Sequence, residues 1–347
     1  MIEMIEKLER KTHRDGNLHP TAFNCLNLLP ENFSYHNDHK NLRPPFSIYS
    51  NSIQEVMQSF NAVLDETDRI STALFNAKGD LDYPLGKLPD LQKNLLFSLQ
   101  FHIDDCYSIL KAIHPNDKKF QKLSAADWLK EVKHPAYTQF RGAINKYKES
   151  FALICKKIKH HGGKLRPIVM YSREHGIVAR TIEKGIQTFP KNARIIGYFL
   201  EGMQPNGRIG PDCDVHPGGR TAISLNCDLR YHFANVYRVG HHLNAAIVTT
   251  VRKLHKIDLP RNLPVKDTKS HYDLESIAER VSKLPPLFFE NEFSKKTPDI
   301  KFHRHSENVD LILEFPGSHM TWEGEVMIYP TIQVDAVCPH YQLPYVR

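Results

Sequence analysis

The chain has 347 residues, of which 41% are hydrophobic and 24% are charged, a composition typical of a globular protein. Its formal net charge is +7, its six cysteines form no Cys-x-x-Cys pair, and no apolar run approaches the ~20 residues needed to span a bilayer. The opening stretch, MIEMIEKLERK, lacks the uninterrupted apolar core of a signal peptide. These features exclude a disulfide scaffold and an integral membrane protein, and they predict a cytoplasmic protein with reduced thiols.

An irregular N-terminal arm is expected over residues 1–49, because prolines recur there among asparagines and histidines. Within this arm, residues 46–49 predict one short strand. Residues 50–77 then carry apolar side chains three or four positions apart, which is the spacing of an amphipathic helix, and Gly79 lies just beyond its end.

Three further helices are predicted before the sequence begins to favour strands. Residues 88–113 predict a long helix that stops before Pro115, and residues 124–132 predict a short one that begins with a capping-box-like Ser124. Residues 141–161 predict another long helix. Together with residues 50–77, these helices make a bundle with a compact core over residues 50–166.

The helix over residues 141–161 has the clearest pattern in the chain. Its apolar seam follows a three-four spacing through Ile144, Tyr147, Phe151, Ile154 and Ile158. The next seam position is His161, and Gly162 and Gly163 then provide a C-terminal stop that tolerates positive φ. The apolar stripe therefore leads directly into imidazole groups.

After the bundle, the sequence predicts an α+β portion over residues 167–347. Strands are expected over residues 167–171, 177–186, 195–203 and 221–225, followed by helices over 228–257 and 270–283, and by strands over 309–315, 325–329 and 332–337. The fold class is therefore α+β, with a helical bundle, an antiparallel β portion and a further long helix.

Positive charge is concentrated where the bundle meets the β portion. Residues 141–194 hold thirteen basic and three acidic residues, a local net charge of +10, whereas the rest of the chain sums to −3. A basic block on a nearly neutral remainder is the electrostatic footprint of a protein that binds phosphate backbones. The candidate nucleic-acid-binding residues in the block are Lys157, Lys159, Lys164 and Arg166.

A helical bundle whose last long helix ends in the string KIKHH resembles the HEPN superfamily, which includes ribonuclease toxins and antiviral effectors. In catalytic members an arginine precedes a histidine by a few residues, and two such helices face each other across a homodimer and cut RNA without a metal. Here four residues separate Lys156 from His161, and Cys155 occupies the commonest arginine register when counted back from His160. The resemblance covers residues 50–166.

The resemblance implies RNA binding, a homodimer and a toxin or phage-defence role, with metal-independent RNA cleavage as a further expectation. In such a mechanism His160 or His161 would be the general base on a ribose 2′-hydroxyl. Lys156 would stabilise charge in the transition state. No cofactor is implied.

Other interpretations stay open at this point. Arg238 and His242 lie one turn apart on the predicted helix over 228–257, where they could hold one phosphate between them. The basic helix end could instead dock an acidic partner, which would make the protein a non-catalytic adaptor. A third alternative is a metal-dependent hydrolase, because Asp212, Asp214 and His216 alternate and would point the same way in an extended backbone.

Overall fold

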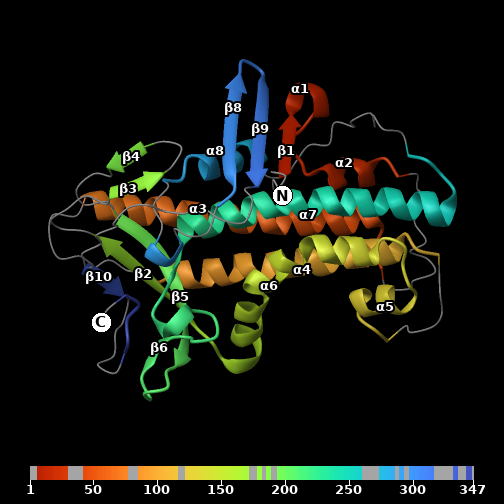
Figure 1. The fold of residues 1–347 in the computed structure, drawn as a ribbon. Coiled ribbons are helices and arrows are strands. Elements are labelled where there is room, and N and C mark those ends of the chain that lie inside the picture. Colours follow the sequence, from red (N-terminus) through yellow and green to blue (C-terminus); the bar gives the residue numbers. More distant parts are fainter. Residues whose placement is uncertain are drawn as a thin grey trace.

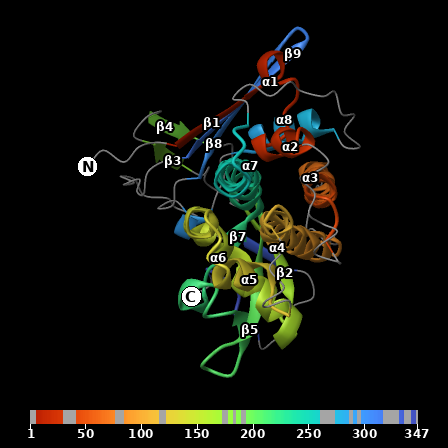
Figure 2. The same cartoon turned by 90° about the vertical axis from the view of Figure 1, so that its right-hand side faces the viewer.

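The computed structural model has a mixed α+β fold in which long helices form the body of the molecule (Figure 1). The β1–β9–β8 sheet stands on one side of these helices, and β2, β5, β6 and β10 gather on the other side (Figures 1 and 2). The residues that the structure describes are 6–29, 42–76, 85–115, 122–171, 178–181, 185–188, 194–259, 273–285, 289–292, 297–315, 331–334 and 341–345.

The predicted long helices are confirmed. They are α3 (Pro45–Asn76), α4 (Leu88–Ala112), α6 (Tyr137–His161) and α7 (Leu225–Thr250), which continues as a π-helical turn over Val251–His255. The shorter helices are α1 (Thr12–Asp15), α2 (Thr21–Asn27), α5 (Ala125–Glu131) and α8 (Leu274–Ser282). The hydroxyl of Ser124 accepts a hydrogen bond from the N–H of Asp127, which caps α5 as expected.

The strands pair in antiparallel sheets. One sheet has the order β1 (Glu6–Lys11), β9 (Asn308–Phe315), β8 (Asp299–His305). A second has the order β10 (Thr331–Val334), β2 (Leu165–Tyr171), β5 (Arg194–Met203), β6 (Ile209–Pro211), with β7 (Ile223–Ser224) also paired to β5. β3 (Val178–Thr181) and β4 (Gly185–Thr188) form a separate hairpin.

Two predictions about the N-terminal arm are wrong. Residues 6–27 form β1, α1 and α2 instead of an irregular segment, and Leu18, Phe23 and Leu26 are buried in the core. Residues 46–49 belong to α3 and not to a strand. Pro45 is the first residue of this helix, a position that suits the fixed φ of proline.

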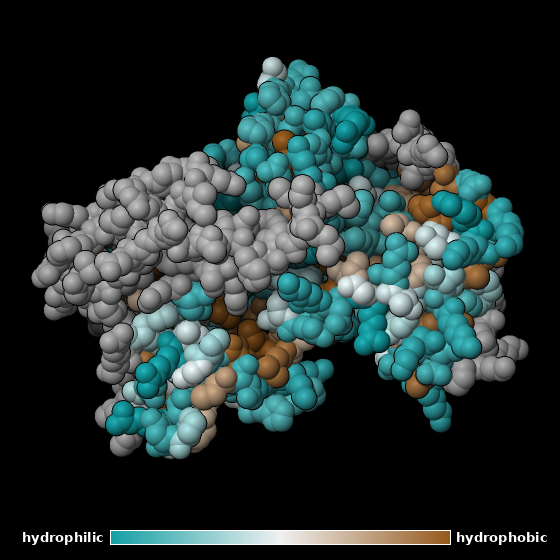
Figure 3. All heavy atoms as spheres, viewed as in Figure 1, coloured by the Kyte–Doolittle hydropathy of each residue, from teal (hydrophilic) through white to brown (hydrophobic). Residues whose placement is uncertain are grey.

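β8 was not predicted, and the strand expected over residues 325–329 lies outside the described residues. The sequence of β8, DIKFHRH, has one buried residue, Ile300. Its charged and imidazole side chains leave almost no alternation of apolar and polar residues by which a strand could be predicted. The protruding end of this sheet is accordingly covered by hydrophilic residues (Figure 3).

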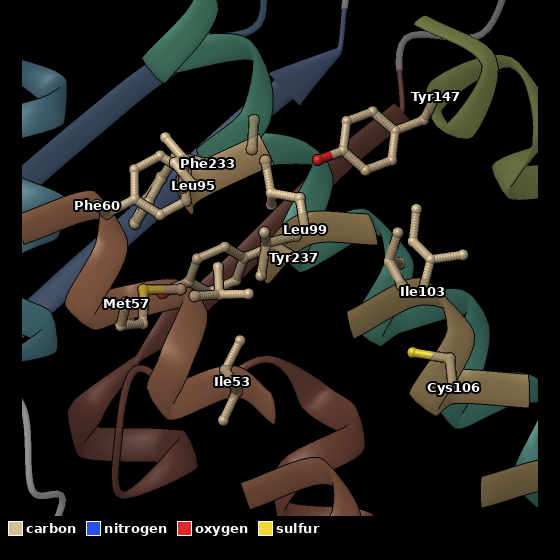
Figure 4. Close-up of a cluster of buried hydrophobic side chains, with 14 of the residues drawn as sticks. Ile53, Met57, Phe60, Leu95, Leu99, Ile103, Cys106, Tyr147, Phe233 and Tyr237 are labelled. Carbon is tan, nitrogen blue, oxygen red and sulfur yellow. The ribbon is translucent and has the colours of Figure 1, made fainter. Parts of the chain in front are cut away.

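One hydrophobic core joins residues from all three predicted ranges, including Leu18 of the arm, Phe60 of the bundle and Leu311 of β9. At its centre, side chains of α3, α4 and α7 face one another (Figure 4): Ile53, Met57, Phe60, Leu95, Leu99, Ile103, Phe233 and Tyr237. A smaller cluster around Phe199 and Phe289 lies beside β2 and β5. Within the described ranges, no helix combines the length and apolar character that a bilayer crossing requires.

Candidate nucleic-acid interface

The apolar face of α6 is buried along most of the helix, whereas the last turn is exposed. Ile144, Phe151 and Ile154 are 1–3% exposed, Ile158 is half-buried, and His161, which continues the same stripe, is exposed. The last turn of α6 therefore extends beyond the side chains that the core covers. This is why the periodicity runs into imidazole groups.

Two glycines turn the chain from α6 into the sheet within three residues. Gly162 has φ 66°, in the left-handed region that glycine favours at a helix C-terminus, and the N–H of Gly163 donates to the carbonyl of Lys157 at 3.1 Å. A Cβ on Gly163 would lie 3.1 Å from a methyl group of Leu200. The carbonyl of Lys164 then accepts the N–H of Glu201 at 2.8 Å, which places the end of α6 beside β5.

Five side chains at this end of α6 form a surface that we call the cationic tip: Lys156, Lys159, His160, His161 and Lys164. All five are exposed, and none makes an ion pair or a side-chain hydrogen bond with another residue of the described ranges. Positive charge at this position is favoured by the partial negative charge of the helix C-terminus. The tip therefore presents basic groups that no acidic side chain of the described structure neutralises.

Two other expected nucleic-acid-binding residues of the block are bound to acidic side chains. The Nζ atom of Lys157 lies 2.7 Å from Oδ2 of Asp212 and 2.6 Å from Oδ2 of Asp214. Arg166 pairs with Glu201 at 2.5 Å and lies over the ring of Tyr341. Counting charge along the sequence missed both contacts, because the acids come from β5 and from the segment after β6.

The three residues that were expected to bind a metal make contacts within the protein instead. Asp212 and Asp214 bind Lys157, and Nε2 of His216 accepts the N–H of Leu200 at 2.9 Å. Burial lowers the pKa of His216 to about 4, so its imidazole is neutral. In the part of the chain that the structure describes, no group of three or more His, Cys, Asp or Glu side chains is arranged to hold a metal ion.

Arg238 and His242 hold an internal carboxylate where a phosphate was expected. Oε2 of Glu6 lies 2.7 Å from Nε of Arg238, and its Oε1 lies 3.4 Å from Nε2 of His242. The contact with His242 and the charge of Arg238 lower the pKa of Glu6, although partial burial opposes them. The pair therefore fixes β1 against α7.

A buried cysteine occupies the position at the end of α6 where the resemblance predicted an arginine. Cys155 is 6% exposed, and its thiol donates to the carbonyl of Leu96 at 3.6 Å, so the position points towards α4. Burial raises the pKa of this thiol to about 12. Lys156 and His160 lie one turn apart on the same face, whereas Lys156 and His161 lie roughly 140° apart around the helix.

A buried polar network that was not predicted from the sequence holds α6 in place. The hydroxyl of Tyr147 lies 3.1 Å from Nδ1 of His232, whose Nε2 lies 3.1 Å from Oδ1 of Asp228. Oδ2 of Asp228 accepts hydrogen bonds from Gln92 at 2.5 Å and from Tyr198 at 2.9 Å. The available signal was the Asp-x-x-x-His spacing on α7, which puts both groups on one face.

The network connects α6 to α7, α4 and β5 through groups that are nearly excluded from solvent. Tyr147 and His232 are 4% and 2% exposed, and burial raises the pKa of Tyr147 well above its usual range. Buried polar groups that satisfy one another fix a single arrangement of the elements that carry them. The cationic tip is thus carried by a helix that the core fixes in position.

Comparison with known proteins supplies no further assignment: no family model, curated protein or solved structure matches this chain.

Proposed function

We propose that the protein binds RNA through the cationic tip. The observation that carries this proposal is that Lys156, Lys159, His160, His161 and Lys164 are all exposed and have no acidic partner among the described residues. Lysines that contact phosphates release counterions, and this release supplies most of the sequence-independent affinity of such proteins.

Basic side chains elsewhere in the described structure support this choice of surface. Arg280 lies 2.8 Å from Asp65 and 2.7 Å from Asp68. Lys301 likewise lies 2.8 Å from Glu314. Basic groups that already have such partners would have to give them up before binding a phosphate, whereas the tip would not. The tip is therefore a better candidate for a polyanion surface than these paired groups.

RNA is favoured over an acidic protein by the resemblance of residues 50–166 to HEPN proteins. Lysine carries a compact charge on a flexible side chain and does not need the fixed bidentate geometry of arginine. It therefore suits the irregular backbone of single-stranded RNA. An adaptor role with an acidic partner is the alternative, and it predicts that the tip shows no affinity for RNA.

The geometry supports binding more than cleavage. Catalytic HEPN proteins need an arginine near the histidine, and here the buried Cys155 takes the commonest arginine register. Cleavage by His160 or His161 with Lys156 in a homodimer stays a prediction. It is tested by incubating RNA in EDTA with the wild type and with the His160→Ala/His161→Ala variant, because only the wild type should cut.

Binding is tested by the fluorescence anisotropy of a labelled 20-nucleotide oligouridine at several salt concentrations. The variant Lys156→Gln/Lys159→Gln/Lys164→Gln should bind more weakly, and its plot of log K against log salt should lose about 0.7 in slope for each lost phosphate contact. The matched control changes three lysines that pair with acids elsewhere: Lys93→Gln/Lys283→Gln/Lys301→Gln. Equal weakening by both triple variants would show that overall charge, and not the tip, binds the RNA.

A further inference from the structure

The carboxylates that hold Lys157 are not equivalent. Asp212 is part of the local backbone structure: its side chain is 13% exposed, and its Oδ1 accepts the N–H groups of Asp214 at 3.0 Å and Val215 at 3.2 Å. A Cβ on Gly202 would lie 2.7 Å from its Oδ2. Asp212 therefore shapes this turn whether or not Lys157 is present.

Asp214 has a different role. Its side chain is 71% exposed, and within the described ranges the contact of its carboxylate is the one with Nζ of Lys157, at 2.6 Å. No turn or strand depends on that carboxylate. Its removal would leave the backbone contacts made by Asp212 in place.

The Lys157 ammonium is saturated by this arrangement. It has three N–H donors, and three carboxylate oxygens lie within 2.8 Å of it, two from Asp212 and one from Asp214. One lysine facing two carboxylates leaves a local charge of −1. This excess negative charge lies beside the cationic tip, because Lys157 precedes His161 by one turn on the same face and is adjacent to Lys156 in the sequence.

We propose that Asp214 is an internal competitor of RNA: its carboxylate occupies the N–H of Lys157 that a phosphate would otherwise take and repels phosphates from the cationic tip. This inference rests on the proposed RNA binding. To reach Lys157, RNA bound at the tip would first have to displace the exposed Asp214 carboxylate, whereas the Asp212–Lys157 pair would persist. Asp214 would thus limit the affinity of the tip and its number of phosphate contacts.

The test measures binding of the labelled oligouridine to Asp214→Asn in the full-length protein at 50 and 200 mM salt. We expect tighter binding and a salt slope steeper by up to about 0.7, so that affinity falls up to about 2.6-fold more than in the wild type between the two concentrations. In a Lys157→Gln background, Asp214→Asn should leave the slope unchanged, because the released donor is then missing.

The matched control is Glu149→Gln, which removes the same charge from an exposed acid of α6 that hydrogen-bonds Asn145. It lies seven residues before Lys156, roughly 10 Å along the helix, and should leave the slope unchanged.

The outcomes separate the two proposals. A wild type that binds no oligouridine refutes the proposed function itself. If the wild type binds and the tip variant does not, RNA binding by the tip stands. An unchanged slope or weaker binding in Asp214→Asn then refutes only the proposed role of Asp214 as a competitor. An equal gain in Glu149→Gln would overturn it too, since the effect would then be one of general charge.

Discussion

Replacing Asp228 with alanine should destabilise the protein far more than replacing a solvent-exposed aspartate. The Asp228 carboxylate faces three buried donors or potential donors, on Gln92, Tyr198 and His232. Alanine would leave these groups without an acceptor in a region from which water is largely excluded. Most of the lost stability therefore comes from the partner groups left unpaired and not from the Asp228 carboxylate itself.

The magnitude follows from these contacts. Each buried polar group left without a partner costs about 1 to 3 kcal/mol. Because the three groups share one carboxylate and can relax together, we expect a loss of about 4 kcal/mol in the free energy of unfolding. Tyr147→Phe should cost less, about 1 to 2 kcal/mol, because it deprives His232 of a single hydrogen bond.

The measurement is urea unfolding followed by circular dichroism, with Asp104→Ala as the control. Asp104 also lies on a long helix, but it is exposed and pairs with Lys148 at 3.1 Å on the surface, a contact worth about 0 to 1 kcal/mol. The reasoning fails if Asp228→Ala and Asp104→Ala lower the midpoint equally at an unchanged denaturant slope.

Three other predictions concern pH, space and reactivity. Burial raises the pKa of Glu292 from 4.5 to about 7, so its contribution to stability is full below pH 4.5 and is lost as pH rises to about 7. In urea unfolding, the wild type should therefore lose about 3 kcal/mol of its free energy of unfolding across this window, and Glu292→Gln should lose much less. A Cβ at Gly197 would overlap a carbonyl of β7 and an aromatic ring, so Gly197→Ala should lower the melting temperature, whereas Gly142→Ala, with open space in α6, should raise it. Iodoacetamide should label the exposed Cys213 of the native protein long before the buried Cys155, as peptide mass spectrometry would show.

The long helices could be predicted because each carries its own evidence. In α6 the apolar positions recur for more than four turns, and Gly162 marks the end at the residue where the structure ends it. β1 and β8 carry little such evidence, because the outer face of their sheet is charged and the inner face of β1 includes the buried Arg10. β1 is recognised by its partner β9, which lies far away in the sequence, and β8 is recognised by its pairing with the adjacent β9 across a two-residue turn.

The charged contacts show the same limit more clearly. Lys157 and Asp212 are 55 residues apart in the sequence, and Glu6 reaches Arg238 from near the N-terminus. Neither pairing leaves a local signature, since any acid brought near by the fold could neutralise any base. The sequence could therefore locate the basic block, but it could not tell which of its charges remain available to a ligand.

The available charges and the stabilising contacts lie on different parts of α6, and this separation makes the two roles independently measurable. Tyr147 joins the buried network about 16 Å along the helix before Ile158, after which the side chains of α6 are exposed. Changes at the network should therefore alter the free energy of unfolding. Changes at Lys159 or His160 remove no buried contact and should alter RNA affinity at nearly constant stability. A tip variant that lost both would show that the end of α6 contributes to folding and would remove the reason for regarding it as a binding surface.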